Sequence, residues 1–145
     1  MTINTLVIVQ DSREQTPWSF PGIPVRVAAL PAGDYSVAGL ESVFSIERKE
    51  LNDLVACITF ERERFERELA RGACLRSLYL LVESDLSTIE AGRYRSKVSP
   101  NAVIGSLVAW LARFPNLKTL FAGSRAGGQR LAGRILSREW IEAQK

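Results

Sequence analysis

Residues 33–58 read GDYSVAGLESVFSIERKELNDLVACI, and this stretch contains the clearest evidence about the fold. Residues 34–37 and 42–49 have the composition of β-strands and are joined through Gly39. From Glu50 the pattern changes to that of an amphipathic helix. The apolar residues at helical spacing are Leu51, Leu54, Val55 and Ile58. The stretch therefore predicts two paired strands that lead directly into a helix.

The flanking sequence predicts further strands and helices. The additional strands are expected at residues 5–9, 25–29, 78–82 and 117–121. The additional helices are expected at residues 61–71, 99–111 and 129–139. Strands come first as a meander and later alternate with helices, which predicts an α/β fold with a mixed central β-sheet flanked by helices. A chain of 145 residues has the size of one domain, so we expect residues 1–145 to form a single domain.

The composition excludes several kinds of site. The chain has no histidine, which rules out Ser-His and Cys-His nucleophile pairs and the two-histidine zinc motif. Phosphate chemistry would then depend on carboxylates, lysine and a hard cation such as Mg²⁺ or Mn²⁺. The net charge of +3 is compatible with a DNA partner. No apolar run approaches the ~20 residues that span a bilayer, and no secretory signal is visible, so we expect a cytoplasmic protein without membrane contact.

Asp34, Glu47 and Lys49 are the candidate catalytic residues. Because side chains alternate along a strand, Glu47 and Lys49 project from one face of residues 42–49, while Ile46 faces the core. Pairing of the two strands would bring Asp34 beside Glu47. Two neighbouring carboxylates repel each other unless a cation lies between them, so the pair predicts a Mg²⁺ or Mn²⁺ site. The alternative for the Glu-x-Lys spacing alone is an exposed charged pair at a strand end.

Three short motifs make the prediction more specific. They are Asp11-x-Arg13-Glu14, Gly33-Asp34-Tyr35, and Ile46-Glu47-Arg48-Lys49 followed by Asp53. Together they resemble the XPF-type nuclease domain, a branch of the restriction-endonuclease-like PD-(D/E)XK superfamily. The resemblance covers most of the chain and implies a restriction-endonuclease-like fold.

The resemblance also implies roles for individual residues. Asp34 and Glu47 would bind the metal together with the main-chain carbonyl of Arg48, and Lys49 would assist catalysis. Asp11 would be a further acidic ligand, or would support the ligands. The supporting acids would be Glu14 and Asp53. The alternative for these two acids is an ordinary position without a role in the site.

Basic residues are the candidate DNA contacts. Arg13 would order the cleft or touch a phosphate. Arg62 is the nearest match to an arginine that reaches the edge of the site in this family, although Glu61 replaces the usual glycine. The alternating charges of this segment also fit a solvated helix face. A basic cluster that would follow a phosphate backbone, or form a mobile solvated loop, comprises Arg93, Arg95 and Lys97. The glycine-rich residues 123–128 lack the ending of a P-loop and favour a plain turn.

The expected function is hydrolysis of DNA by metal-activated water, leaving a 5′-phosphate and a 3′-hydroxyl. Relatives of this type favour branched DNA such as flaps and forks, which points to DNA repair or recombination. They usually carry added helix-hairpin-helix units or a helicase, so we expect a homodimer or a partner protein to supply DNA contacts here. One alternative is a non-catalytic DNA-binding or scaffolding subunit of a nuclease complex. Another is a carboxylate-pair hydrolase acting on sugars, in which the lysine has no evident role.

Overall fold

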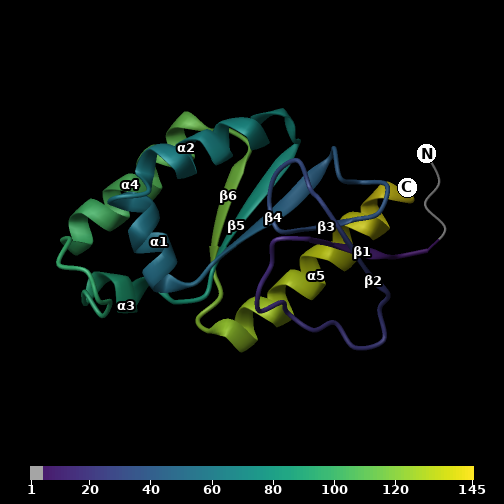
Figure 1. Cartoon of the computed structure of the whole chain (residues 1–145), viewed down its shortest axis with the longest axis horizontal. Coiled ribbons are helices and arrows are strands. Elements are labelled where there is room, and N and C mark those ends of the chain that lie inside the picture. The colour runs from purple at the N-terminus through teal and green to yellow at the C-terminus, as the bar shows by residue number, and fades with distance from the viewer. Residues whose placement is uncertain (1–4) are drawn as a thin grey trace.

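The computed structural model describes residues 5–145, and in this part of the chain six strands form one sheet. The strands are β1 (Ile8–Asp11), β2 (Val25–Ala28), β3 (Tyr35–Val37), β4 (Phe44–Lys49), β5 (Ser77–Val82) and β6 (Leu117–Phe121). Their order across the sheet is β2-β1-β3-β4-β5-β6 (Figure 1). β3 is antiparallel to β1 and β4, and the other pairs are parallel. The sheet is therefore mixed, which confirms the predicted class.

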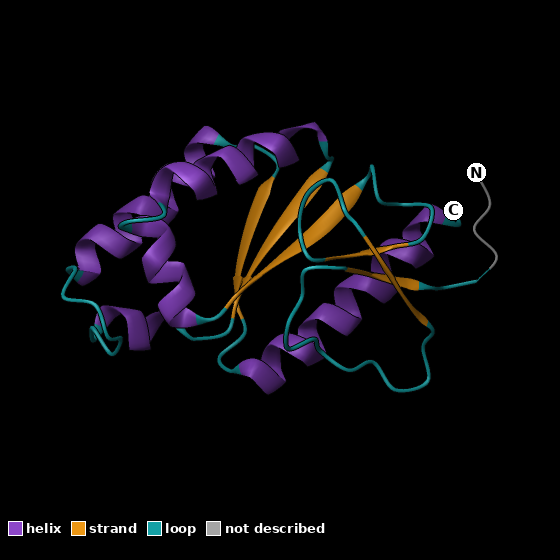
Figure 2. Cartoon of the chain, viewed as in Figure 1, coloured by secondary structure: helices purple, strands orange, loops and turns teal. Residues whose placement is uncertain are grey.

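Helices cover both faces of the sheet (Figure 2). They are α1 (Leu51–Ile58), α2 (Arg62–Arg71), α3 (Leu86–Glu90), α4 (Pro100–Arg113) and α5 (Arg125–Ala143), with a short 3₁₀ helix, η1 (Gly72–Cys74), after α2. One core lies between the sheet and α1, α2 and α4, and the other lies beneath α5. β5 is covered on both faces and apolar residues dominate it, whereas the buried part of β4 alternates between apolar and polar residues.

The alternation along β4 separates the two cores. Phe44 and Ile46 are fully buried in the core beneath α5. Ser45 and Glu47 point to the opposite face, as predicted from the period of a strand. Glu47 is 9% exposed there, and this places a carboxylate at the border between the sheet and α2.

Side-chain caps define the helix that follows β4 and the helix that opens after β6. The Glu50 carboxylate accepts hydrogen bonds from the amides of Asn52 and Asp53 and starts α1. Ser124 caps α5 through the Gly127 amide, so α5 begins at Arg125. The predicted plain turn at residues 123–128 is therefore wrong for residues 125–128.

Two further differences from the predictions concern the start of β1 and the presence of α3. β1 begins at Ile8, whereas the strand was expected at residues 5–9. The five-residue helix α3 was not predicted, because it is too short to show a helical period and depends on the Asp85 cap. Neither difference changes the order of the strands around the candidate site.

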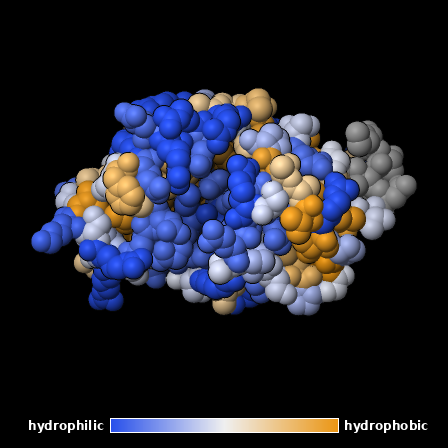
Figure 3. All heavy atoms as spheres, viewed as in Figure 1, coloured by the Kyte–Doolittle hydropathy of each residue, from blue (hydrophilic) through white to orange (hydrophobic). Residues whose placement is uncertain are grey.

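The β2 edge of the sheet is partly apolar. The face seen in Figure 3 is hydrophilic over most of its area, and hydrophobic side chains gather at the end where β1, β2 and α5 lie in Figure 1. Val25 and Val27 of β2 are 42% and 60% exposed. Within residues 5–145, no helix combines the length and the hydropathy needed to cross a membrane.

Candidate active site

A glycine turn fixes the position of Asp34 just before β3. Gly33 has a φ of +77°, a conformation that residues with side chains rarely adopt. A Cβ atom at Gly33 would lie 2.0 Å from Ser45 Oγ, so any larger residue would collide with β4. The Asp34 amide then donates a hydrogen bond of 2.7 Å to the Ile46 carbonyl. The turn therefore holds the Asp34 side chain against the C-terminal half of β4.

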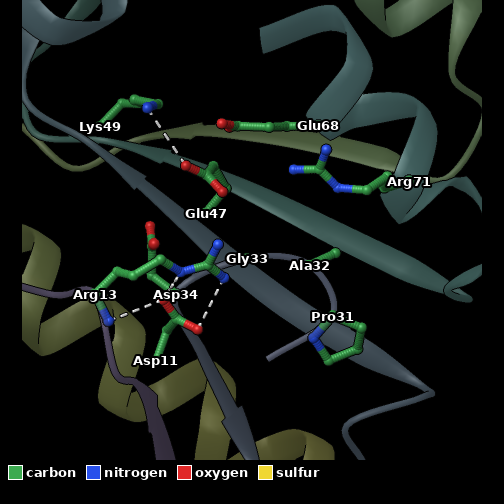
Figure 4. Close-up of a pocket in the computed structure, with 10 residues that line it drawn as sticks. All are labelled: Asp11, Arg13, Pro31, Ala32, Gly33, Asp34, Glu47, Lys49, Glu68 and Arg71. Atoms are coloured by element: carbon green, nitrogen blue, oxygen red, sulfur yellow. Dashed lines mark hydrogen bonds and ion pairs between the residues drawn. The ribbon is translucent and has the colours of Figure 1, made fainter. Parts of the chain in front are cut away.

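Asp34, Glu47 and Lys49 line one hollow, and we call Asp34 and Glu47 the carboxylate pair (Figure 4). The Arg48 backbone amide donates a hydrogen bond of 2.8 Å to Asp34 Oδ2. Lys49 Nζ lies 3.4 Å from Glu47 Oε2 and 5.0 Å from the centre of the Phe65 ring. The fold thus brings together the three residues that the sequence nominated for catalysis.

Both members of the carboxylate pair hold their protons more tightly than free side chains. Burial raises the pKa of Asp34 to about 6, and the hydrogen bond from the Arg48 amide limits the rise. Burial and the neighbouring Asp34 charge raise the pKa of Glu47 to about 8, although Lys49 opposes the shift. Burial disfavours the Lys49 ammonium, but the negative charges around it, that of Glu47 first, together outweigh this effect and raise the pKa of Lys49. A further cation in the hollow would therefore stabilise the ionised pair.

The oxygen atoms of the hollow suit Mg²⁺ or Mn²⁺. A Mg²⁺ ion commonly uses one or two carboxylates and fills its other positions with water and substrate phosphate. The Arg48 amide points to Asp34, and the carbonyl of the same residue faces the same strand edge. Among residues 5–145, no group of three or more Asp, Glu, His or Cys side chains is arranged to hold a metal ion. A cation held by the carboxylate pair would therefore need solvent or substrate oxygens to complete its shell.

Asp11 lines the same hollow, but its carboxylate is already well bonded. Arg13 donates to it from the backbone amide, Nε and Nη2 at 3.2, 2.8 and 3.1 Å. The Leu30 amide adds a bond of 2.9 Å. Burial acts to raise the pKa of Asp11, but the bonds from Arg13 and Leu30 outweigh it and lower that pKa. In this arrangement Asp11 anchors Arg13 at the rim of the hollow.

Glu14 and Asp53 lie in a different hollow from the carboxylate pair. Glu14 Oε2 accepts hydrogen bonds of 2.8 Å from the Tyr35 hydroxyl and 3.1 Å from Arg48 Nη1. Arg48 Nε also pairs with Glu83 Oε2 at 3.1 Å. The structure thus places these two acids outside the hollow of the pair, and Glu14 affects the site through its bond to Arg48 and through the repulsion between its charge and that of Asp34.

The predicted DNA contacts lie in three places. Arg13 is at the rim of the hollow. Arg62 lies outside it, because its Nη1 donates a bond of 2.8 Å to Ser106 Oγ and its guanidinium lies over the Trp110 ring. The position of Arg62 therefore fits a packing role rather than the expected contact at the edge of the site. The loop between α3 and α4 carries Arg93, Arg95 and Lys97.

Two residues of α2 complete the hollow and were missed in the sequence. Figure 4 shows Glu68 and Arg71 pointing from α2 toward Glu47. Phe65 and Leu69 are buried on the adjoining stripe of the same helix. The three-residue spacing of Phe65, Glu68 and Arg71 contained the signal, because side chains three residues apart share a helix side. The alternating charges of residues 61–68 concealed it by suggesting a solvated face.

Comparison with known proteins gives two findings. The family model of the ERCC4 domain matches residues 10–131. The structure of XPF from Aeropyrum pernix superposes with a TM-score of 0.67 at 18% sequence identity, over 95% of this chain and 68% of that chain. This likeness supports the restriction-endonuclease-like fold. No curated protein sequence matched the chain.

Proposed function

The chain belongs to the ERCC4 domain family, and we propose that it is a Mg²⁺- or Mn²⁺-dependent endonuclease that hydrolyses phosphodiester bonds in DNA. The family is one of structure-specific DNA nucleases. The observation that carries the proposal is that Asp34, Glu47 and Lys49 line a single hollow together with two arginines, Arg13 and Arg71. A non-catalytic subunit would have no need for this arrangement.

Each residue of the hollow has a task in the proposed reaction. Asp34 and Glu47 would hold the cation, which would lower the pKa of a water molecule and offset charge on the phosphate. The Lys49 ammonium positions the attacking water or steadies a non-bridging oxygen. Arg13 and Arg71 attract the scissile phosphate from opposite sides of the hollow, since α2 supplies one and the end of β1 the other.

The proposal extends to substrate and assembly. We expect branched DNA, such as flaps and forks, to be cut to a 5′-phosphate and a 3′-hydroxyl. Domains of this family bind DNA and often dimerise, and we propose that this chain acts as a homodimer or with a partner protein that adds DNA contacts. Light scattering of the purified chain with and without fork DNA would show which assembly forms.

Cleavage of labelled flap, fork and duplex DNA tests the activity. The wild-type chain should cut with Mg²⁺ or Mn²⁺ and not with EDTA. Asp34→Asn and Glu47→Gln should be inactive, and Lys49→Ala should be slower by about 100- to 1000-fold, the usual loss when one transition-state donor is removed. The matched control is Glu90→Gln, an exposed acid at the end of α3. Cleavage by Asp34→Asn would refute the site, and binding without any cleavage by the wild type would favour a scaffolding subunit.

A further inference from the structure

Phe60 is exposed to an unusual degree for a large apolar side chain. It lies in the turn between α1 and α2, and 84% of its surface is open to solvent. Backbone bonds fix this turn, since the Thr59 amide donates to the Val55 carbonyl at 3.2 Å and the Glu61 amide to the Ala56 carbonyl at 3.0 Å. The backbone therefore holds the ring away from both cores.

A hollow beside Phe60 separates the ring from the loop that precedes α4. Val55 and Ala56 of α1 form its apolar floor, and Arg95 of the loop lies on the other side. The Arg95 amide donates a bond of 3.0 Å to Asn52 Oδ1, which attaches the loop to the first turn of α1. The hollow thus combines an aromatic face, an apolar floor and a cation, and we call it the Phe60 hollow.

The loop beside the Phe60 hollow is basic and held in place. Residues 91–98 contain no acidic residue. The Tyr94 hydroxyl donates a bond of 2.7 Å to the Val98 carbonyl, and the Tyr94 ring packs against the core. The cations of the loop are Arg93, Arg95 and Lys97. Within residues 5–145, none of the three forms an ion pair, so a polyanion would meet unpaired positive charge on an ordered loop.

We propose that the Phe60 hollow binds an unpaired nucleotide of the substrate strand, with the base stacked on Phe60 and the phosphate against Arg95. Aromatic rings stack on any base and neighbouring cations follow the backbone in sites for single-stranded nucleic acid. The carboxylate that lines the hollow, Asp53, disfavours a small free anion but can accept a hydrogen bond from an N–H group on the Watson–Crick edge of a base. A single nucleotide can therefore contact all three side chains: its base stacks on Phe60 and bonds to Asp53, and its phosphate pairs with Arg95.

Helix α1 separates the Phe60 hollow from the carboxylate pair, and its length gives the spacing between them. α1 starts two residues after Lys49, and its eight residues span about 12 Å at about 1.5 Å per residue. At about 3.4 Å per nucleotide this is roughly four nucleotides of one strand. The inference rests on the proposed function for the identity of the substrate, and it makes single-stranded or flapped DNA the favoured substrate over continuous duplex.

Fluorescence anisotropy in EDTA tests the Phe60 hollow without any cleavage. The full chain is titrated against a labelled oligothymidylate and a labelled duplex at several salt concentrations. Phe60→Ala should weaken oligothymidylate binding by about 5- to 100-fold, the usual range for loss of one base stack, and should leave the salt dependence unchanged. Phe60→Tyr should bind like wild type. Arg95→Ala should instead reduce the slope of log K against log salt by about 0.7.

Phe121→Ala supplies the matched control, because this phenylalanine of β6 is also exposed, at 37%. The inference is overturned if Phe60→Ala binds oligothymidylate like wild type, if Phe121→Ala weakens binding equally, or if Phe60→Ala changes only the oligomeric state. Circular dichroism shows whether each variant is folded. Failure of the nuclease proposal is visible separately, because it would appear as absent cleavage in Mg²⁺ while the binding differences in EDTA persist.

Discussion

The Arg48 backbone amide lies 2.8 Å from Asp34 Oδ2 and donates a hydrogen bond to it. One strand therefore controls both members of the carboxylate pair, because the residue after Glu47 also fixes Asp34. The side chain of Arg48 points to the opposite face, where it pairs with Glu14 and Glu83. The central arginine of the Glu-Arg-Lys motif thus joins the candidate active site to the core beneath α5.

Replacing Arg71 should slow cleavage without affecting the fold. Arg71 is exposed at the end of α2 and points into the hollow, where it would contact the scissile phosphate. A charge-assisted hydrogen bond contributes about 1.5–3 kcal/mol, so Arg71→Ala should lower kcat/KM by about 10- to 150-fold. The comparison is Arg67→Ala, an exposed arginine one turn earlier that lines a different hollow. Equal rates for the two variants would show that Arg71 has no role in the reaction.

Gly33 should tolerate no side chain. Gly33→Ala adds the cost of a left-handed backbone, about 1–2 kcal/mol, and a collision with Ser45. Gly22→Ala separates the two effects, because Gly22 has a φ of +82° but nothing within 4 Å of an added Cβ. We expect Gly33→Ala to lower the free energy of unfolding in urea by clearly more than Gly22→Ala, and to reduce cleavage as well. Similar losses in the free energy of unfolding for both variants would mean that β4 moves away from the added Cβ atom without loss of stability.

Stability of the metal-free protein should fall as the pH rises. The folded-state pKa of Glu47, about 8, is above its ordinary value of 4.5, so the folded protein binds this proton more tightly than the unfolded chain. The resulting stabilisation is complete below about pH 4.5 and is lost progressively up to about pH 8. Glu47→Gln cannot ionise. Relative to that variant, the wild-type free energy of unfolding should decrease by at least about 1.4 kcal/mol across this window, the equivalent of one pKa unit.

Chemical denaturation at several pH values, in EDTA and in excess Mn²⁺, measures this difference. Mn²⁺ should remove most of the decrease in the wild type, because a bound cation stabilises the ionised carboxylates. It should have little effect on Glu47→Gln. Parallel pH curves for the two proteins in EDTA would contradict the raised pKa.

The fold was largely predictable because the sheet is strongly patterned. The apolar β5 and the alternation along β4 identify the strands, and the change to helical spacing after Glu50 identifies the start of α1. The start of α5 was not predictable from pattern, since the glycine at 127 is required by the Ala122 carbonyl, which would lie 2.0 Å from an added Cβ atom. A single sequence does not show such a tertiary contact.

The part of the candidate site that depends on local backbone geometry was predictable from the sequence. Strand alternation and the turn at Gly33 suffice to place the carboxylate pair beside Lys49. The separation of Glu14 from the carboxylate pair depends on the face of the sheet to which the Arg48 side chain points. The presence of Glu68 and Arg71 in the hollow depends on how α2 packs against the sheet. Both are properties of the assembled layers, which strand alternation and turn geometry do not determine.

Removing the Arg48 side chain should destabilise the protein strongly. Its partner Glu83 has only 3% of its side chain exposed and also accepts a bond of 2.9 Å from Trp18 Nε1. Breaking a buried ion pair by deleting one member costs about 3–5 kcal/mol, because the other charge stays buried without compensation. Arg48→Met should therefore lower the free energy of unfolding by about this amount, and Arg48→Met with Glu83→Gln should recover part of it. The control is Arg26→Met, which breaks the exposed pair with Glu41 and should cost about 0–1 kcal/mol. If the double variant is less stable than Arg48→Met alone, the Glu83 charge is compensated by other groups and the ion pair does not hold the second core.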